Sequence, residues 1–214
     1  FIMQDDLLKF EQKVAKYVGA KYAVGVGNAT DGLEICLASL KEKKHGKVII
    51  SAHTMLATAS AIVMNGMIPV PVDIGLDGLI DVNSIEENID QDTVGIMPTQ
   101  LNGRVCDMDG IKKLVEKHEL FLIEDAAQAL GAKYKGKCAG TFGNSSAISF
   151  FPAKTLGSLG DAGIVITNSS ETFDKVYQLH DHGRNFEGET KSWGRNSRLD
   201  NLQAAILNWK LDSY

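Results

Sequence analysis

Residues 22–40 read YAVGVGNATDGLEICLASL, and this stretch indicates the fold. The first five residues are apolar, aromatic or glycine, and they predict a short strand over 22–26. Leu33, Leu37 and Leu40 then recur every three to four residues, which predicts a helix over 30–40 with one apolar face. A strand that passes through a short glycine-containing turn into a helix is the basic unit of an α/β protein.

The same alternation of short apolar strands and amphipathic helices continues along the chain. Further strands are expected over residues 48–50, 69–72, 94–97, 121–123, 147–150 and 164–166, and further helices over 5–17, 54–65, 82–89, 111–117, 173–180 and 198–211. Strands that are apolar on both faces and separated by helices form mostly parallel sheets buried between helix layers. We therefore predict an α/β fold with about seven strands, mostly parallel, between layers of helices.

The composition of the 214-residue chain is that of an ordinary globular domain with a small negative charge. Its 22 basic and 27 acidic residues give a net charge of −5, so we expect neither nucleic acid nor an anionic membrane surface as a partner. No apolar run reaches the roughly 18 residues of a membrane-spanning helix. The three cysteines stand far apart, which fits neither a disulfide framework nor a zinc site. We therefore expect no metal site and a reducing, cytoplasmic compartment.

Functional residues are expected where the strands end, because ligands of open α/β sheets bind outside the carboxyl ends of the strands. The stretch GNATDG over residues 27–32 follows the first strand. Its helix start can bind an anion, although a simple N-cap by Asn28 or Thr30 explains the same residues equally well. Asp125 follows the strand over 121–123, where a carboxylate either faces a ligand or caps a helix.

The most unusual stretch is SFFPAK over residues 149–154, which joins an apolar strand to a glycine-rich loop. Lys154 is either an ordinary exposed lysine or an amine held in a closed site, where it can form an imine. An anion-binding helix start, an acid at a strand end and such a lysine are the parts that a pyridoxal phosphate site needs. They would hold its phosphate, its pyridinium nitrogen and its aldehyde.

These features belong to a longer series of motifs that resembles the DegT/DnrJ/EryC1/StrS family of pyridoxal phosphate-dependent sugar aminotransferases. The motifs are GNATDGL at 27–33, PVPVD at 69–73, CDMD at 106–109, IEDAAQA at 123–129, GTFG at 140–143, SFFPAK at 149–154, GDAG at 160–163, NSRLD at 196–200 and QAA at 203–205. The resemblance implies fold type I, with residues 1–214 forming a three-layer, aspartate-aminotransferase-like large domain around a mostly parallel seven-stranded sheet. The family's N-terminal segment and small C-terminal domain are expected to be absent from this chain.

The resemblance also implies roles for individual residues. Lys154 matches the lysine that bonds to the cofactor aldehyde and later acts as general acid and base, and Asp125 matches the acid paired with the pyridinium nitrogen. These two are the expected catalytic residues. The expected cofactor-binding residues are Ala29, Thr30, Met55, Asp125, Gln128, Ser149, Lys154 and Asn196. Asn196 matches an asparagine supplied by the neighbouring subunit, which implies a homodimer with shared active sites.

Two positions depart from the family's pattern. Met55 stands where the family usually has an aromatic residue on the cofactor ring, and we expect its thioether to pack there instead. Gln100 stands where the family often has histidine, and we expect it to bear on substrate recognition.

Lysine at position 154 favours amino transfer, because a dehydratase branch of the family carries histidine there. The expected function is transfer of an amino group, from glutamate as the donor, to a keto group of a nucleotide-linked deoxysugar. The alternatives are amination of a cyclitol ketone, a sugar dehydratase reaction, and a cofactor-binding but inactive regulatory or structural fragment.

Overall fold

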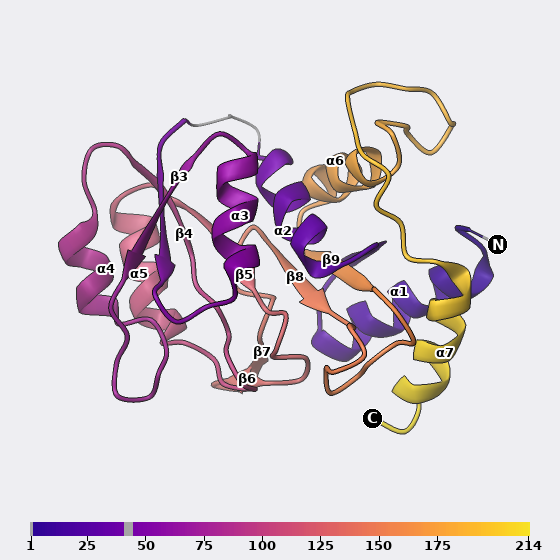
Figure 1. Cartoon of the computed structure of the whole chain (residues 1–214), viewed down its shortest axis with the longest axis horizontal. Helices are drawn as coiled ribbons and strands as arrows, with labels where there is room; N and C mark the ends of the chain where they lie inside the picture. The colour runs from indigo at the N-terminus through magenta and orange to yellow at the C-terminus, as the bar shows by residue number, and fades with distance from the viewer. Residues whose placement is uncertain (1, 41–44) are drawn as a thin grey trace.

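A seven-stranded sheet runs through the protein (Figure 1), whose computed structural model describes residues 2–40 and 45–214. The strands lie in the order β1 (Tyr22–Val26), β9 (Gly163–Thr167), β8 (Ser145–Ser149), β5 (Phe121–Asp125), β4 (Thr93–Met97), β2 (Lys47–Ser51) and β3 (Ile68–Val72). Only β9 runs antiparallel to its neighbours, while every other pair is parallel. The predicted mostly parallel seven-stranded sheet is therefore confirmed.

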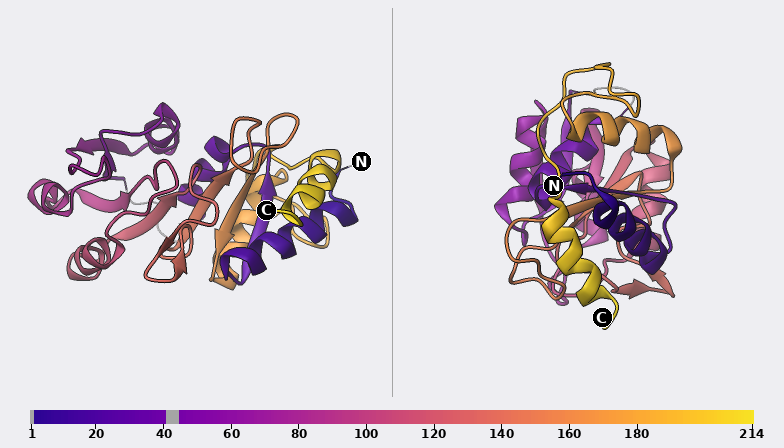
Figure 2. Two further views of the ribbon diagram at one scale, coloured as in Figure 1. Left: turned by 90° about the horizontal axis from the view of Figure 1, so that it is seen from below. Right: turned by 90° about the vertical axis from the view of Figure 1, so that its right-hand side faces the viewer.

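Helices cover both faces of this sheet and complete the three layers (Figure 2). One face carries α2 (Ala29–Ala38), α3 (Leu56–Met64) and α6 (Ser170–His180), and the other carries α1 (Asp5–Val18), α4 (Val82–Asn88), α5 (Met108–Lys117) and α7 (Asn201–Leu211). Neighbouring residues of a strand reach opposite layers: Ile50 of β2 packs in the same core as Ile62, whereas Ile49 packs in the same core as Ile111. Burial on both faces explains why the strands are continuously apolar.

The topology brings several strand ends to one edge of the sheet. Because β1 and β8 both run antiparallel to β9, they point the same way, and β5, β4 and β2 are parallel to β8 in turn. The segments that follow β1, β2, β4, β5 and β8 therefore emerge at the same edge. This is the place where the sequence predicts functional residues.

Two local features differ from the sequence prediction. A hairpin of two-residue strands, β6 (Lys133–Tyr134) and β7 (Lys137–Cys138), forms a separate small sheet. Strands of two residues are too short to show an alternating pattern. The helix predicted from Ile111 begins earlier, at Met108, because the side chain of Asp107 accepts a hydrogen bond from the N–H of Gly110 and caps it.

Candidate active site

A cavity of about 280 Å³ opens at the edge where the parallel strands end. The segments that follow β1, β2, β4, β5 and β8 contribute to its walls, together with the segment that precedes β9. Its lining residues are Asn28, Ala29, Thr30, Leu33, Met55, Ala57, Thr99, Asp125, Ala127, Gln128, Ser149, Phe151, Lys154, Asp161 and Ala162. Every predicted site residue except Asn196 is among them.

The N-terminus of α2 forms one wall of this cavity. Asn28 Oδ1 accepts a hydrogen bond from the N–H of Asp31 at 2.9 Å, and the first intrahelical bond runs from the N–H of Gly32 to Asn28 O at 3.1 Å. The N–H groups of Ala29 and Thr30 precede that bond, so the helix itself does not use them. Asn28 is thus an N-cap, and the same helix start still offers an anion site.

Asp125, the last residue of β5, places a buried carboxylate at the cavity. Oδ2 accepts a hydrogen bond from Thr58 Oγ1 at 2.6 Å, and Oδ1 accepts one from the N–H of Ala127 at 3.1 Å. Burial raises the pKa of Asp125, while these two hydrogen bonds and the charge of Lys154 act to lower it. The residue is 2% exposed, so this carboxylate is held in place by the protein and not by water.

Lys154 lies on the turn that follows β8, and its side chain is half-buried. Its backbone N–H donates to Phe151 O at 2.8 Å, which closes the turn. Ser149, at the end of β8, is buried, and its Oγ accepts a hydrogen bond from the N–H of Phe151 at 3.3 Å. The strand end and the turn thus fix both side chains at the cavity.

A second cavity of about 300 Å³ adjoins the first, since both are lined by Ala127, Gln128, Ser149 and Lys154. Gln128 is half-buried, and its Oε1 accepts a hydrogen bond from the N–H of Asn102 at 3.3 Å. Lys154 therefore stands between two adjoining spaces.

The expectation that Gln100 bears on substrate recognition is wrong, because this side chain is fully buried on the other face of the sheet. Its Nε2 donates to Glu124 Oε2 at 2.9 Å, and its Oε1 accepts from the N–H of Cys106 at 2.8 Å. Successive residues of a strand point to opposite faces, so Asp125 faces the cavity and Glu124 faces away. Gln100 belongs to the structural cluster around Glu124.

That cluster satisfies a second buried carboxylate. Besides Gln100, backbone N–H groups donate to Glu124 from Gly140 at 2.8 Å, Phe142 at 2.6 Å and Gly143 at 3.1 Å. Burial raises the pKa of Glu124, and the four hydrogen bonds oppose that rise. Glu124 therefore anchors the loop between β7 and β8 and does not face the site.

Asn196 is the predicted site residue that the structure does not bring to the cavity. It is exposed and lies at the end of the loop after α6, where it forms a bridge to Asp181. The neighbouring Ser197 contacts the region before α2, since its Oγ accepts the N–H of Gly27 at 3.0 Å. Within one chain, Asn196 has no place in the site.

Sequence reasoning also missed residues that line the cavity. Thr99 comes just after β4, so the rule that ligands bind at the carboxyl ends of strands could have identified it. Asp161 comes before β9 and reaches the cavity because that strand is antiparallel, so the rule did not point to it. Thr58, the partner of Asp125, gave no such signal, because it comes from α3 and meets Asp125 only in the folded protein.

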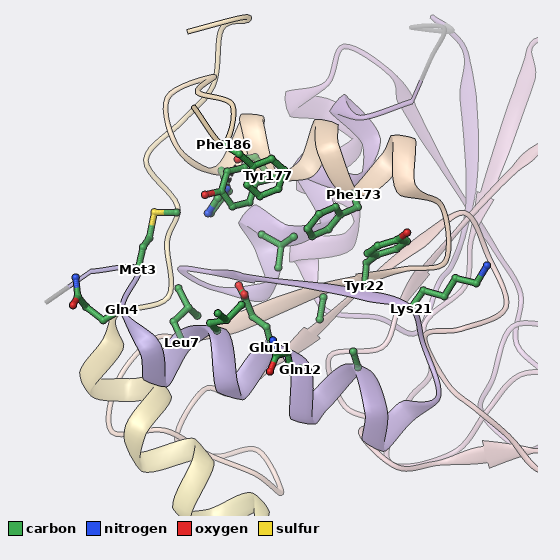
Figure 3. A pocket seen from close by; sticks show the side chains of 15 residues that line it. Met3, Gln4, Leu7, Glu11, Gln12, Lys21, Tyr22, Phe173, Tyr177 and Phe186 are labelled. Carbon is green, nitrogen blue, oxygen red and sulfur yellow. Dashed lines mark hydrogen bonds between the residues drawn. The ribbon is translucent and has the colours of Figure 1, made fainter. Parts of the chain in front are cut away.

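A larger cavity, of about 390 Å³, lies beside the free edge of β1 and contains none of the predicted residues (Figure 3). Tyr22, Phe173, Tyr177 and Phe186 supply aromatic walls, and Glu11 of α1 lies in it. Its lining is mostly apolar and includes neither Lys154 nor the start of α2. Size alone does not make it the centre of the chemistry.

In residues 2–40 and 45–214, no helix is both long enough and apolar enough to cross a membrane. Within the same ranges, no group of three or more His, Cys, Asp and Glu side chains is placed to hold a metal ion.

Over its whole length, the chain matches one family of known proteins. The model of the DegT/DnrJ/EryC1/StrS aminotransferase family matches residues 1–214. The chain is 41% identical over 211 residues to a pleiotropic regulatory protein of Geobacillus stearothermophilus, and this match covers 98% of the chain and 57% of that protein. It is also 41% identical over 212 residues to dTDP-3-amino-3,6-dideoxy-alpha-D-galactopyranose transaminase of Aneurinibacillus thermoaerophilus. That match covers 99% of the chain and 58% of the transaminase.

Among solved structures, DesV of S. venezuelae in complex with a ketimine intermediate superimposes with a TM-score of 0.94 at 36% identity. This match covers 100% of the present chain and 58% of DesV. The chain thus spans a little under three fifths of the length of these relatives. Since the family model covers every residue, the chain belongs to the DegT/DnrJ/EryC1/StrS aminotransferase family.

Proposed function

We propose that this chain is the cofactor-binding large domain of a pyridoxal phosphate-dependent sugar aminotransferase. The reaction proposed moves an amino group, with glutamate as the donor, to a keto group of a nucleotide-linked deoxysugar. The observation that carries the proposal is the meeting of Lys154, Asp125 and the start of α2 in one cavity. The transaminase names of relatives support the substrate class.

The residues present fit this cofactor. The free N–H groups at the start of α2 suit its phosphate, and Gly163 lets β9 begin close to that helix start, since a Cβ there would lie 2.6 Å from the carbonyl carbon of Asn28. The Asp125 carboxylate, with one hydrogen bond on each oxygen, retains lone pairs for a pyridinium N–H.

When bound, pyridoxal phosphate supplies an electron sink that stabilises negative charge on the substrate carbon. The protein's own residues do the rest. Lys154 would hold the cofactor through its aldehyde, and its amine, once free, would serve as general acid and base. Asp125 would pair with the ring nitrogen and favour its protonated form. Ser149 and Gln128 would hold the polar edge of the ring, and Met55 would pack on its face.

We extend the proposal to a homodimer in which Asn196 completes the partner's site. The support is its exposure on a loop outside its own cavity, together with an apolar surface along α3, whose N-cap Met55 lines that cavity. Met55 is 67%, Leu56 74% and Met64 70% exposed, which is typical of a covered interface. The three free, buried cysteines are consistent with a reducing compartment, and we place the enzyme in the cytoplasm.

The visible spectrum of the purified chain with pyridoxal phosphate tests this function. We expect an absorption band that depends on Lys154 and that glutamate bleaches. Lys154→Ala should abolish the band, while Lys133→Ala, on the hairpin and in the lining of neither cavity, should keep it. A folded wild-type chain that gives no band, or a band unchanged in Lys154→Ala, would contradict the assignment.

A further inference from the structure

Three threonine hydroxyl groups form a chain of hydrogen bonds that ends on Asp125. Thr58 Oγ1 lies 2.6 Å from Asp125 Oδ2. Thr54 Oγ1 lies 2.7 Å from Thr58 Oγ1 and 2.7 Å from Thr99 Oγ1. Thr58 is fully buried and Thr99 is 3% exposed, so water does not compete with the inner part of this chain. Only Thr99 also lines the cavity.

The direction of the protons in this chain follows from counting donors. Each hydroxyl has a single proton. If Thr58 gives its proton to a charged Asp125, it must accept from Thr54. Thr54 has then used its own proton and must accept from Thr99. All three O–H dipoles therefore point toward the carboxylate and stabilise its negative charge.

The opposite direction requires a proton on Asp125 Oδ2. Asp125 would then donate to Thr58, and Thr99, which in the described residues has Thr54 as its one hydroxyl partner, would have to donate into the cavity. A hydroxyl group also donates a stronger hydrogen bond to a charged carboxylate than to a neutral carboxyl group. The chain of hydroxyl groups thus favours the charged carboxylate, against the effect of burial.

We propose that Thr58, aligned by Thr54 and Thr99, is a positioning residue that keeps the Asp125 carboxylate charged and oriented toward the cavity. The importance of that charge rests on the proposed function, in which Asp125 pairs with a pyridinium nitrogen. The direction of the pKa effects agrees: burial raises the pKa of Asp125, and the Thr58 hydrogen bond is the largest effect that lowers it, followed by Ala127 and then Lys154.

The test is to measure the pKa of Asp125 in the chain without cofactor. The pKa is obtained by titration from the ¹³C chemical shift of the Asp125 carboxyl carbon, and that NMR signal is assigned by its absence in Asp125→Asn. Thr58→Val keeps the shape and removes the hydroxyl, and we expect the pKa to rise by about one to two units. Thr58→Ser retains the hydroxyl and should keep the wild-type value. Thr54→Val should raise the pKa by less, and Thr99→Val by about a few tenths of a unit.

Thr167→Val is the matched control, because Thr167 is also buried and donates to Asn144 O at 2.8 Å, away from the cavity. It should leave the pKa of Asp125 unchanged. If Thr58→Val does not fold, Thr54→Val carries the same test. The inference is overturned if neither variant raises the pKa, or if Thr167→Val raises it equally.

Titration with pyridoxal phosphate then separates this inference from the proposed function. We expect the dissociation constant to rise about tenfold in Thr58→Val, as a one-unit change in the pKa of the carboxylate implies, and to stay unchanged in Thr167→Val. A raised pKa in a chain that does not bind the cofactor would support the threonine chain and refute the function. Cofactor binding with an unmoved pKa would refute the threonine chain alone.

Discussion

Stability should fall as the pH rises from about 4.5 to about 7, because the carboxyl group of Glu11 is half-buried against β1 (Figure 3). Its Oε1 accepts the N–H of Gly25 at 2.7 Å, on the strand edge that faces away from β9. Burial raises the pKa of Glu11 from 4.5 to about 7, and the Gly25 hydrogen bond only partly opposes this rise. The folded protein therefore binds a proton here that the unfolded chain has released.

The sign and size of this pH dependence follow from the difference in proton binding between the folded and unfolded states. A carboxyl whose pKa is raised on folding contributes stability that is full below the unfolded pKa of 4.5 and is lost as the pH rises through about 7. A difference of about 2.5 units corresponds to about 3 kcal/mol. Glu11→Gln keeps an acceptor for Gly25 and never ionises. We expect it to match the wild type near pH 4.5 and to exceed it by about 3 kcal/mol at pH 8.

Urea unfolding of both proteins from pH 4 to pH 8 measures this difference directly. Taking the difference removes the contribution of His180, which lines the same cavity and is present in both. Glu116→Gln, at an exposed position of α5, should give a curve parallel to that of the wild type. A constant difference between Glu11→Gln and the wild type across this range would refute the burial argument.

Three further perturbations test other contacts. Glu124→Ala leaves four donors, two of them buried and two part-buried, without an acceptor, so we expect the free energy of unfolding to drop by about 3 kcal/mol in urea, with an unchanged m-value. Gly163→Ala places a methyl group 2.8 Å from the nitrogen of Ala29, and this displacement of α2 should weaken pyridoxal phosphate binding about tenfold in an absorbance titration. Met55→Ala should raise the same dissociation constant about two- to tenfold, and Met55→Phe should not raise it.

Much of the fold could be predicted because its strands are local and apolar on both faces. Each strand of the main sheet overlaps its predicted range, and the helix over residues 5–17 ends, as expected, at Gly19 in a left-handed conformation. The order of the strands and the reversal of β9 could not be predicted. They depend on which crossovers bury the helices best, and no short pattern records that choice.

The site could be predicted as far as motifs at strand ends reach. Lys154, Asp125 and the start of α2 follow strands directly, and the structure brings them together. The inward position of Glu11 could not be predicted, because a glutamate on an amphipathic helix is expected to face solvent. In the structure its carboxylate accepts the N–H of Gly25 instead. The misassigned Gln100 shows the same limit. The alternation of side chains along β5 and the path of the nearby loop decide which face of the sheet the buried Gln100 side chain reaches.

The most direct test of the proposed site is to locate the bond between cofactor and protein. The chain is incubated with pyridoxal phosphate, reduced with borohydride and digested, and the masses of its peptides are measured by mass spectrometry. We expect one modified peptide, containing Lys154, that disappears in Lys154→Ala and persists in Lys133→Ala. Modification spread over surface lysines, or confined to a lysine outside the cavity, would contradict the proposed site and the function that depends on it.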